Sequence, residues 1–179
     1  MGTETPPVFQ LPAALLSEGF ALRPETDGDL SFLMRLYAST REEELAVTGW
    51  SPEQKQAFLA SQFQAQRHHY RTYIENCRFE VLECRDEAAG RLYLETRATQ
   101  LHIVDIALLP AWRGKGIGTA ILEALIDTAR RSGRGVGIFV EKFNPALRLY
   151  RRLGFTDIRD DGIYLELERN PPGAASAVS

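Results

Sequence analysis

The chain has little cysteine and no long apolar run. Cys77 and Cys84 are its two cysteines among 179 residues, too few for a disulfide framework or a zinc site built from cysteine. No stretch approaches the roughly 18 apolar residues that a membrane-spanning helix needs. The N-terminus lacks the order of charged and then apolar residues that marks a signal peptide. We therefore expect a cytoplasmic protein that does not enter a membrane.

The chain also has no excess of positive charge and few histidines. Lys and Arg total 21 against 24 Asp and Glu, so the net charge of −3 gives no general reason to bind nucleic acid or an anionic membrane. The chain has three histidines. His68 and His69 are adjacent and would face different directions on a helix, so they do not form a metal-binding pair. We expect no metal site.

The most informative stretch is Arg113–Gly118, which reads Arg-Gly-Lys-Gly-Ile-Gly. It follows the apolar run 101–110 and precedes an amphipathic segment, so the order is strand, glycine-rich turn and helix. A helix N-terminus leaves backbone N–H groups unpaired and carries partial positive charge, which suits a phosphate. Glycines let the backbone approach a ligand, and Arg113 and Lys115 add cationic groups. The stretch predicts a pyrophosphate site or, if no ligand binds, a tight strand-to-helix turn.

The glycine spacing differs from two common phosphate motifs. A Walker A loop has four residues between its glycines and then Gly-Lys-Ser/Thr, whereas here Gly116 follows Lys115. The dinucleotide fingerprint needs a third glycine where this chain has Thr119. A nucleotide-binding domain of the Rossmann type is therefore a disfavoured alternative.

Hydrophobic periodicity predicts strands and helices in one domain over residues 19–169. Strands are expected at 20–23, 79–83, 91–98, 101–109, 136–141, 155–158 and 163–168. Helices are expected at 30–37, 52–73, 119–131 and 145–153, and a turn at Asp86–Gly90. Residues 1–18 should form an extended lead-in, and 170–179 a disordered tail.

Two motifs resemble those of the GNAT acyltransferase superfamily. Segment Ala107–Thr119 is similar to the family's acyl-CoA signature, a strand and a proline before Arg/Gln-x-x-Gly-x-Gly/Ala, filled here by Arg113, Gly116 and Gly118. Segment Asn144–Phe155 is similar to the family's second motif. The resemblance implies an α/β (mixed α+β) GNAT fold, in which a twisted mixed sheet of about six to seven strands has helices on both faces.

The resemblance also implies acetyl-CoA (coenzyme A) as the acyl donor, with no metal. In the family, the strand before the signature pairs through its backbone with the pantetheine arm, and the signature loop holds the pyrophosphate. Asn144 would bond the pantetheine or order a water there. The cofactor-binding residues implied are Ile106, Ala107, Leu108, Arg113, Gly114, Lys115, Gly116, Ile117, Gly118, Thr119, Asn144 and Tyr150.

Acyl transfer to an amine needs a group that protonates the departing thiolate. Tyr150 matches the tyrosine that does this in many family members, and a phenol suits a thiolate of similar basicity. The residues alone favour a core tyrosine whose hydroxyl makes a structural bond. The resemblance favours Tyr150 as the general acid.

The general base is less well defined. Asp105 lies among apolar residues, where an unpaired carboxylate would have a raised pKa and could accept a proton from an ammonium group. Glu95 on the preceding strand is a second candidate. Buried carboxylates are more often hydrogen-bonded or ion-paired than catalytic, so each also has a structural interpretation. His102 is expected to lie far from the thioester.

We therefore expect an acyl-CoA-dependent N-acetyltransferase in which an amine attacks acetyl-CoA directly. The acceptor is a small molecule or a peptide, and its identity stays open because acceptor loops vary within one fold. Dimers are common in the family, which leaves a homodimer open. The alternative is a non-catalytic acyl-CoA-binding or regulatory domain of the same fold.

Overall fold

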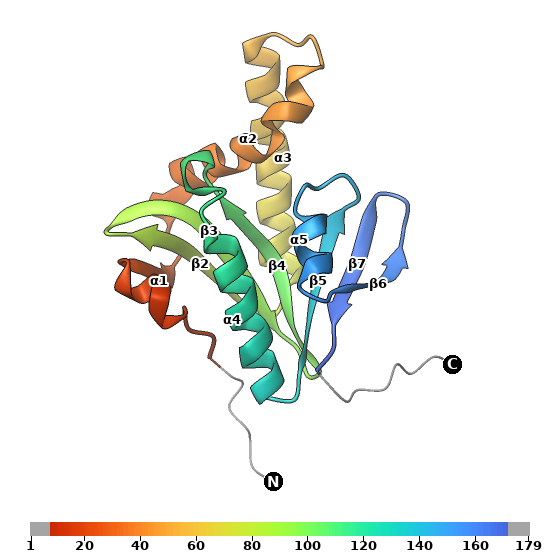
Figure 1. Ribbon diagram of the computed structural model, residues 1–179. Helices are drawn as coiled ribbons and strands as arrows, with labels where there is room; N and C mark the ends of the chain where they lie inside the picture. Colours follow the sequence, from red (N-terminus) through yellow and green to blue (C-terminus); the bar gives the residue numbers. More distant parts are fainter. Residues whose placement is uncertain (1–7, 172–179) are drawn as a thin grey trace.

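The computed structural model describes residues 8–171, which form one mixed sheet with helices on both faces (Figure 1). The strand order is β1-β2-β3-β4-β5-β7-β6, in a sheet of seven strands. The strands are β1 (Phe20–Pro24), β2 (Cys77–Cys84), β3 (Glu87–Thr96), β4 (Gln100–Leu108), β5 (Gly135–Glu141), β6 (Thr156–Asp160) and β7 (Tyr164–Arg169). The predicted fold class is confirmed.

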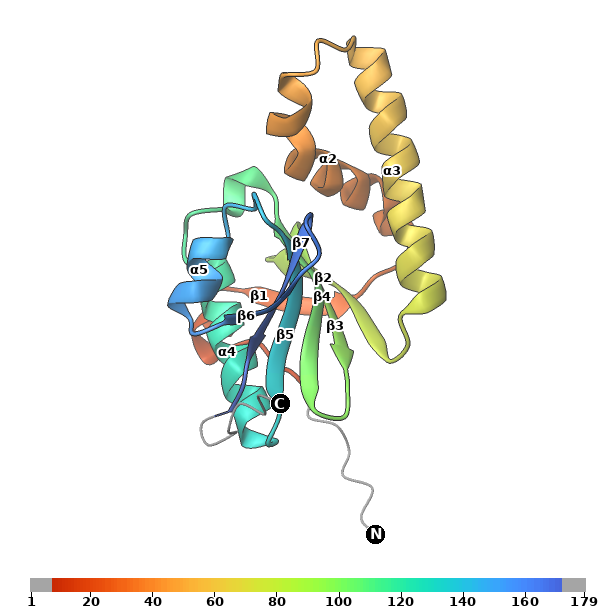
Figure 2. The ribbon, with the colours of Figure 1, turned by 90° about the vertical axis from the view of Figure 1, so that its right-hand side faces the viewer.

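The longer helices separate into two layers. Helix α4 (Ile117–Arg131) and helix α5 (Leu147–Arg152) lie on one face of the sheet, and α2 (Leu30–Ala46) and α3 (Pro52–Tyr73) lie on the other (Figure 2). Each layer has its own core. The larger core joins α4 and α5 to the sheet, and the smaller one gathers Phe32, Leu33, Leu36, Tyr37, Phe63 and Val81.

Only β4 and β5 pair in parallel, and every other neighbouring pair of strands is antiparallel. A Rossmann domain has a mostly parallel sheet with a different strand order. The topology therefore excludes the Rossmann alternative for the described part of the chain.

The extended lead-in expected for residues 1–18 is wrong where the structure describes it. Residues 13–17 form the short helix α1 (Ala13–Ser17), which begins after Pro12. Phe9, Leu11 and Leu15 are buried in the same core as α4, so apolar side chains hold this segment on the sheet. Residues 1–7, and residues 172–179 of the expected tail, lie outside the described part of the chain.

The largest other differences from the predicted element boundaries are in α2 and at the start of β3. The helix expected at 30–37 continues to Ala46, because Leu45 on its last turn is also buried. The turn expected at Asp86–Gly90 is shorter, since Arg85 and Asp86 have φ values of 49° and 68° and β3 begins at Glu87. Positive φ at both central residues is the geometry of a two-residue hairpin turn, which leaves Gly90 inside the strand.

The start of α3 follows its sequence signal. Ser51 caps the helix by accepting a hydrogen bond from the Gln54 backbone N–H, and the Gln54 side chain bonds back to Ser51. Pro52 takes the first helical position, where its missing N–H costs nothing. This confirms the predicted start of the helix.

Candidate active site

The strands β4 and β5 pair at one end and then separate. Their parallel register covers only Gln100–Ile103 against Gly135–Ile138, although β4 continues to Leu108 and β5 to Glu141. On its other side β4 stays paired with β3 as far as Leu108. The edge of β4 that faces β5 is thus left open beyond Ile103. Ile106, Ala107 and Leu108, predicted as backbone partners of a cofactor, lie in this open part.

The glycine-rich loop lies directly after the open part of β4. Gly114 and Gly116 have φ values of 70° and 81°, which only glycine adopts without strain. Gly116 is the N-cap of α4 and offers no side-chain bond to the first-turn N–H groups. A Cβ added at Gly114, Gly116 or Gly118 would meet no atom within 4 Å. The loop therefore presents bare backbone to open space at a helix N-terminus, as an anion site requires.

The two cations of the loop point to different partners. The Arg113 guanidinium donates from Nε to the Leu108 carbonyl at 2.8 Å and from a terminal nitrogen to Ser39 Oγ at 3.0 Å. Its side chain thus ties the loop to β4 and α2. Lys115 is exposed, and its Nζ lies 5.4 Å from the centre of the Trp112 ring. Of the two predicted phosphate cations, Arg113 is held by two neutral acceptors, whereas Lys115 makes no hydrogen bond to the described residues.

The second predicted motif places Tyr150 on α5. Tyr150 is 4% exposed and packs edge-to-face on Phe155, with ring centres 5.6 Å apart. Burial raises its pKa, and the negative charge of Asp105 raises it further. The phenol therefore stays protonated at neutral pH. Asn144 accepts a hydrogen bond from the Ala146 N–H at 2.9 Å, so its oxygen shapes the turn before α5.

Asp105 lies in the open part of β4, on the face that α3 covers. Its Oδ2 atom accepts hydrogen bonds from Arg91 at 2.7 Å and from the Tyr70 hydroxyl at 3.1 Å. Arg91 is 4% exposed, and it also donates to the Gln66 side chain. The structure thus gives Asp105 the paired arrangement that its structural interpretation requires. Its charge still acts on Tyr150, which connects the two candidate residues electrostatically.

Glu95 and Asp105 are not brought together. Glu95 stands opposite His102 in the register, whereas Asp105 stands opposite Tyr93. The Glu95 carboxylate accepts a hydrogen bond from Arg97 Nε at 2.9 Å. His102 is buried near the paired end of β4, and burial, with Arg97 nearby, lowers its pKa to about 4. A histidine that stays neutral at physiological pH is not a proton donor there.

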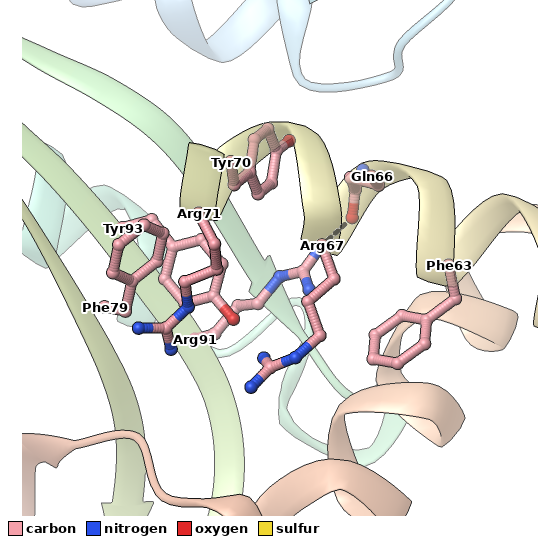
Figure 3. Close-up of a pocket in the computed structure, with 8 residues that line it drawn as sticks. All are labelled: Phe63, Gln66, Arg67, Tyr70, Arg71, Phe79, Arg91 and Tyr93. Atoms are coloured by element: carbon pink, nitrogen blue, oxygen red, sulfur yellow. Dashed lines mark hydrogen bonds between the residues drawn. The ribbon is translucent and has the colours of Figure 1, made fainter. Parts of the chain in front are cut away.

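A polar network that was not predicted from the sequence lies under α3 (Figure 3). The carboxylate of Glu25 is 1% exposed and accepts bonds from Arg67, Arg71 and Tyr93. Burial by itself would raise the pKa of Glu25, but these three donors lower it. The sequence carries one signal, a repeat of arginine at 67 and 71, four residues apart and thus on one helical face.

Beside this network, Arg91 Nε is buried without a hydrogen-bond partner in the described structure. The cavity that its neighbours enclose has a volume of about 10 Å³, about one water molecule. Within residues 8–171, no group of three or more His, Cys, Asp and Glu side chains could hold a metal ion. The same part of the chain has no helix that is both long and apolar enough to span a membrane.

The mixed sheet thus opens beside a glycine-rich helix start. Residues 75–157 match the family described as the acetyltransferase (GNAT) domain. The chain is similar in fold to the PaiA N-acetyltransferase of Thermoplasma acidophilum, solved in complex with coenzyme A. The TM-score is 0.62 at 18% identity, over 84% of this chain and 98% of that one.

Two curated relatives share shorter segments. An N-alpha-acetyltransferase of Sulfurisphaera tokodaii is 33% identical over 69 residues, which are 37% of this chain and 41% of that protein. Streptothricin acetyltransferase of Streptomyces lavendulae is 42% identical over 59 residues, 31% of each chain. The chain thus spans less than half the length of these relatives. The family match, the relatives and the fold together indicate the GNAT N-acetyltransferase superfamily.

Proposed function

We propose that this chain transfers an acetyl group from acetyl-CoA to an amine. The observation that carries the proposal is the juxtaposition of an open strand edge and an open anion site. Beyond Ile103 the edge of β4 faces no strand, and the bare loop Gly114–Gly118 follows at the start of α4. An extended pantetheine arm can pair with the first while the pyrophosphate rests on the second. The residues present therefore fit coenzyme A.

The cofactor contacts follow from these positions. Backbone groups of Ile106, Ala107 and Leu108 hold the pantetheine arm and polarise the thioester carbonyl. The backbone of Gly114–Thr119 receives the pyrophosphate, and exposed Lys115 supplies a positive charge beside it. Since the Arg113 side chain already bonds Leu108 and Ser39, we assign it the task of fixing the loop against β4 and α2.

In the reaction, the acceptor nitrogen attacks the thioester carbonyl carbon and forms a C–N bond. The C–S bond then breaks, and the thiolate takes the phenolic proton of Tyr150. Burial supports this role because it keeps the phenol protonated until a strong base forms beside it. The new amide must also lose the extra proton of the former amine, which requires an acceptor.

Asp105 and Glu95 are the two candidates for that proton acceptor. The carboxylate of Asp105 lies in the open part of β4, and its Oδ2 atom is already paired with Arg91 at 2.7 Å. Asp105→Asn and Glu95→Gln separate the candidates. Loss of the base lowers kcat at neutral pH and matters less at high pH, where the amine arrives deprotonated. A structural role lowers kcat equally at all pH values.

The function is tested by following release of free CoA thiol from acetyl-CoA over a panel of amines. The panel contains peptides with a free N-terminus and streptothricin, because the relatives carry the names N-alpha-acetyltransferase and streptothricin acetyltransferase. We expect turnover with one class of amine and none without an amine. Binding of acetyl-CoA with no turnover over the panel would favour the non-catalytic alternative.

A further inference from the structure

Helices α2 and α3 cover only part of their face of the sheet. The smaller core, which joins them to the sheet, takes its strand residues from β2, β3 and β4 in the described part of the chain. Strands β7 and β6 lie to one side of α3 (Figure 1). On the α4 side, the larger core buries the inward side chains of β5 and β7, which are Ile138, Val140, Leu165 and Leu167.

The side chains that alternate with these buried residues form a surface on the α3 side. They are exposed or partly exposed, because neither helix packs over them. We call this surface the uncovered face, and its residues on β5, β6 and β7 include Phe139, Glu141, Arg159, Tyr164, Glu166 and Glu168.

On the uncovered face, each large aromatic side chain stands beside a carboxylate. The register of β5 and β7 places Phe139 opposite Glu166 and Tyr164 opposite Glu141. Side chains directly opposite each other in antiparallel strands have Cβ atoms about 5 Å apart, so each pair forms one small surface. Phe139 and Tyr164 are each 42% exposed. An aromatic ring and a carboxylate both attract the cation of a Lys or Arg side chain, so each pair suits a basic residue.

Arginines of this chain already contact both carboxylates. Arg41 of α2 donates to Glu141 at 3.2 Å, and Arg159 of β6 lies 3.3 Å from Glu166. The carboxylate side chains are 40% and 29% exposed, and ion pairs in contact with water contribute little free energy. A cation from another molecule can therefore replace either arginine. With Glu168 as a third carboxylate, negative charges outnumber positive ones on this surface.

The uncovered face borders the opening between β4 and β5. Phe139 and Glu141 lie on the part of β5 beyond Ile138, where β5 no longer pairs with β4. The glycine-rich loop, where we propose that the pyrophosphate binds, begins α4 and so lies on the α4 side of the opening. An acceptor amine then reaches the thioester from the α3 side, next to the uncovered face.

We propose that the acceptor is a polypeptide with basic residues close to its N-terminal amine, and that these residues dock on the uncovered face. The inference rests on the proposed function and names its acceptor class. Phe139 and Glu141 are two residues apart on one strand, so the two aromatic–carboxylate pairs lie about 7 Å apart. Side chains at alternate positions of an extended peptide have the same spacing. Lys or Arg at two alternate positions therefore fits both pairs.

A second copy of this chain is the other occupant to consider. A symmetric dimer through the uncovered face would place that face against itself, and so carboxylates against carboxylates. Like charges that face each other across an interface are unfavourable. The negative charge of the face therefore favours a basic partner over a second copy.

Fluorescence anisotropy of labelled peptides tests the docking without turnover. Three otherwise identical peptides carry Lys, Gln or Glu at two alternate positions near an N-terminus that is already acetylated. We expect the Lys peptide to bind roughly three- to tenfold more tightly than the Gln peptide, and this difference to shrink at high salt. The double variant Glu141→Gln, Glu166→Gln should remove the difference. Glu123→Gln, at an exposed glutamate on α4, makes a similar charge change on the other side of the sheet and should have no effect.

Turnover of the same peptides with free N-termini separates this inference from the proposed function. The double variant should raise KM for the Lys peptide roughly three- to tenfold and leave KM for the Gln peptide unchanged. If acetyl-CoA binds and neither peptides nor small amines are acetylated, the proposed function fails. If amines are acetylated and the three peptides have equal KM and equal affinity, only the acceptor class is wrong. A dimer in light scattering that the double variant strengthens would mean that a second copy covers the face, and would also overturn the inference.

Discussion

The two faces of the sheet hold their polar residues in opposite ways. On the α3 face, the charged side chains form ion pairs with one another. Glu25 pairs with Arg67 and Arg71, and Asp105 pairs with Arg91. On the α4 face, the glycine-rich loop leaves backbone N–H groups uncapped and Lys115 without an ion-pair partner among the described residues. A fully satisfied polar network stabilises the fold. The open loop, by contrast, is where we propose that the cofactor binds.

Two buried tyrosines, one on each face of the sheet, differ in their hydrogen bonding. Tyr70 and Tyr150 are both buried tyrosines with raised pKa values, and burial is the first cause for each. The Tyr70 hydroxyl donates its proton in a hydrogen bond to Asp105. Tyr150 packs in the core beside the Phe155 ring, and its hydroxyl makes no hydrogen bond to another described side chain. We therefore propose Tyr150, and not Tyr70, as the residue that protonates the departing thiolate.

The largest expected effect concerns Tyr150. Because general acid catalysis typically contributes roughly 100- to 10 000-fold, Tyr150→Phe should lower kcat by about that factor. The affinity for acetyl-CoA should stay within about twofold of the wild type, because the contacts of the ring are kept. Single-turnover kinetics and calorimetry measure the two quantities. Tyr73→Phe, at a 70% exposed tyrosine on α3, is the control. An unchanged chemical step would remove Tyr150 from the mechanism.

The next effect tests the closed network. Arg91→Met leaves Asp105 without its cation, so the free energy of unfolding should fall by about 3 kcal/mol, as when a buried pair loses one partner. The matched control is Arg97→Met, which breaks the Glu95 pair of an arginine whose side chain is 39% exposed, and should cost less than about 1 kcal/mol. Urea unfolding measures both. Equal costs would show that the buried pair is no more important than the surface one.

The lowered pKa of His102 predicts that the free energy of unfolding depends on pH. The pKa of His102 is about 4 in the folded protein, below the ordinary value of 6.5. Between these two pH values, the unfolded chain binds a proton at His102 and the folded chain does not. This contribution to stability is complete above pH 6.5 and disappears as the pH falls to 4, a loss of about 3 kcal/mol. The variant His102→Gln should lose less stability over this range than the wild type. Parallel curves would contradict the assignment.

The smallest expected effect is the loss of stability when the positive φ of Gly114 is strained. Gly114→Ala puts a Cβ on a residue with φ of 70°, which costs about 1 kcal/mol of unfolding free energy, although the space around it is open. The melting temperature should fall by about 2–4 °C. An unchanged melting temperature would mean that the loop can relax to negative φ, and the fixed loop geometry would be wrong.

The residues predicted the open side of the molecule better than the closed side. The loop Arg113–Gly118 and the start of α3 are local patterns, and a few neighbouring residues fix their geometry. The network is not local: Arg91, Tyr70 and Asp105 come from β3, α3 and β4, and no spacing along the chain shows that they meet. The same reason hid the burial of Phe9 and Leu11, which depends on how the first segment folds back onto the sheet.

The turn at Arg85 and Asp86 shows a second reason why the sequence did not predict the structure fully. Gly90 suggested a turn, but its actual constraint is close approach, since a Cβ there would lie 2.3 Å from the Ala107 carbonyl oxygen on β4. A glycine can mark a turn or a tight contact between strands, and the sequence does not distinguish the two. The contact brings β3 close to the part of β4 that we propose to pair with the cofactor.

The most direct test of the central claim is thermal unfolding with and without acetyl-CoA, for the wild type and Gly118→Asp. An aspartate in the first turn of α4 favours the helix dipole by about 0.3–1 kcal/mol, so the variant alone should unfold no earlier than the wild type. With acetyl-CoA at about 100 times its Kd, the wild-type midpoint should rise by roughly 5–10 °C. The variant should show no rise, because its carboxylate repels the pyrophosphate. No rise in the wild type, or an equal rise in both, would contradict a pyrophosphate site at this loop.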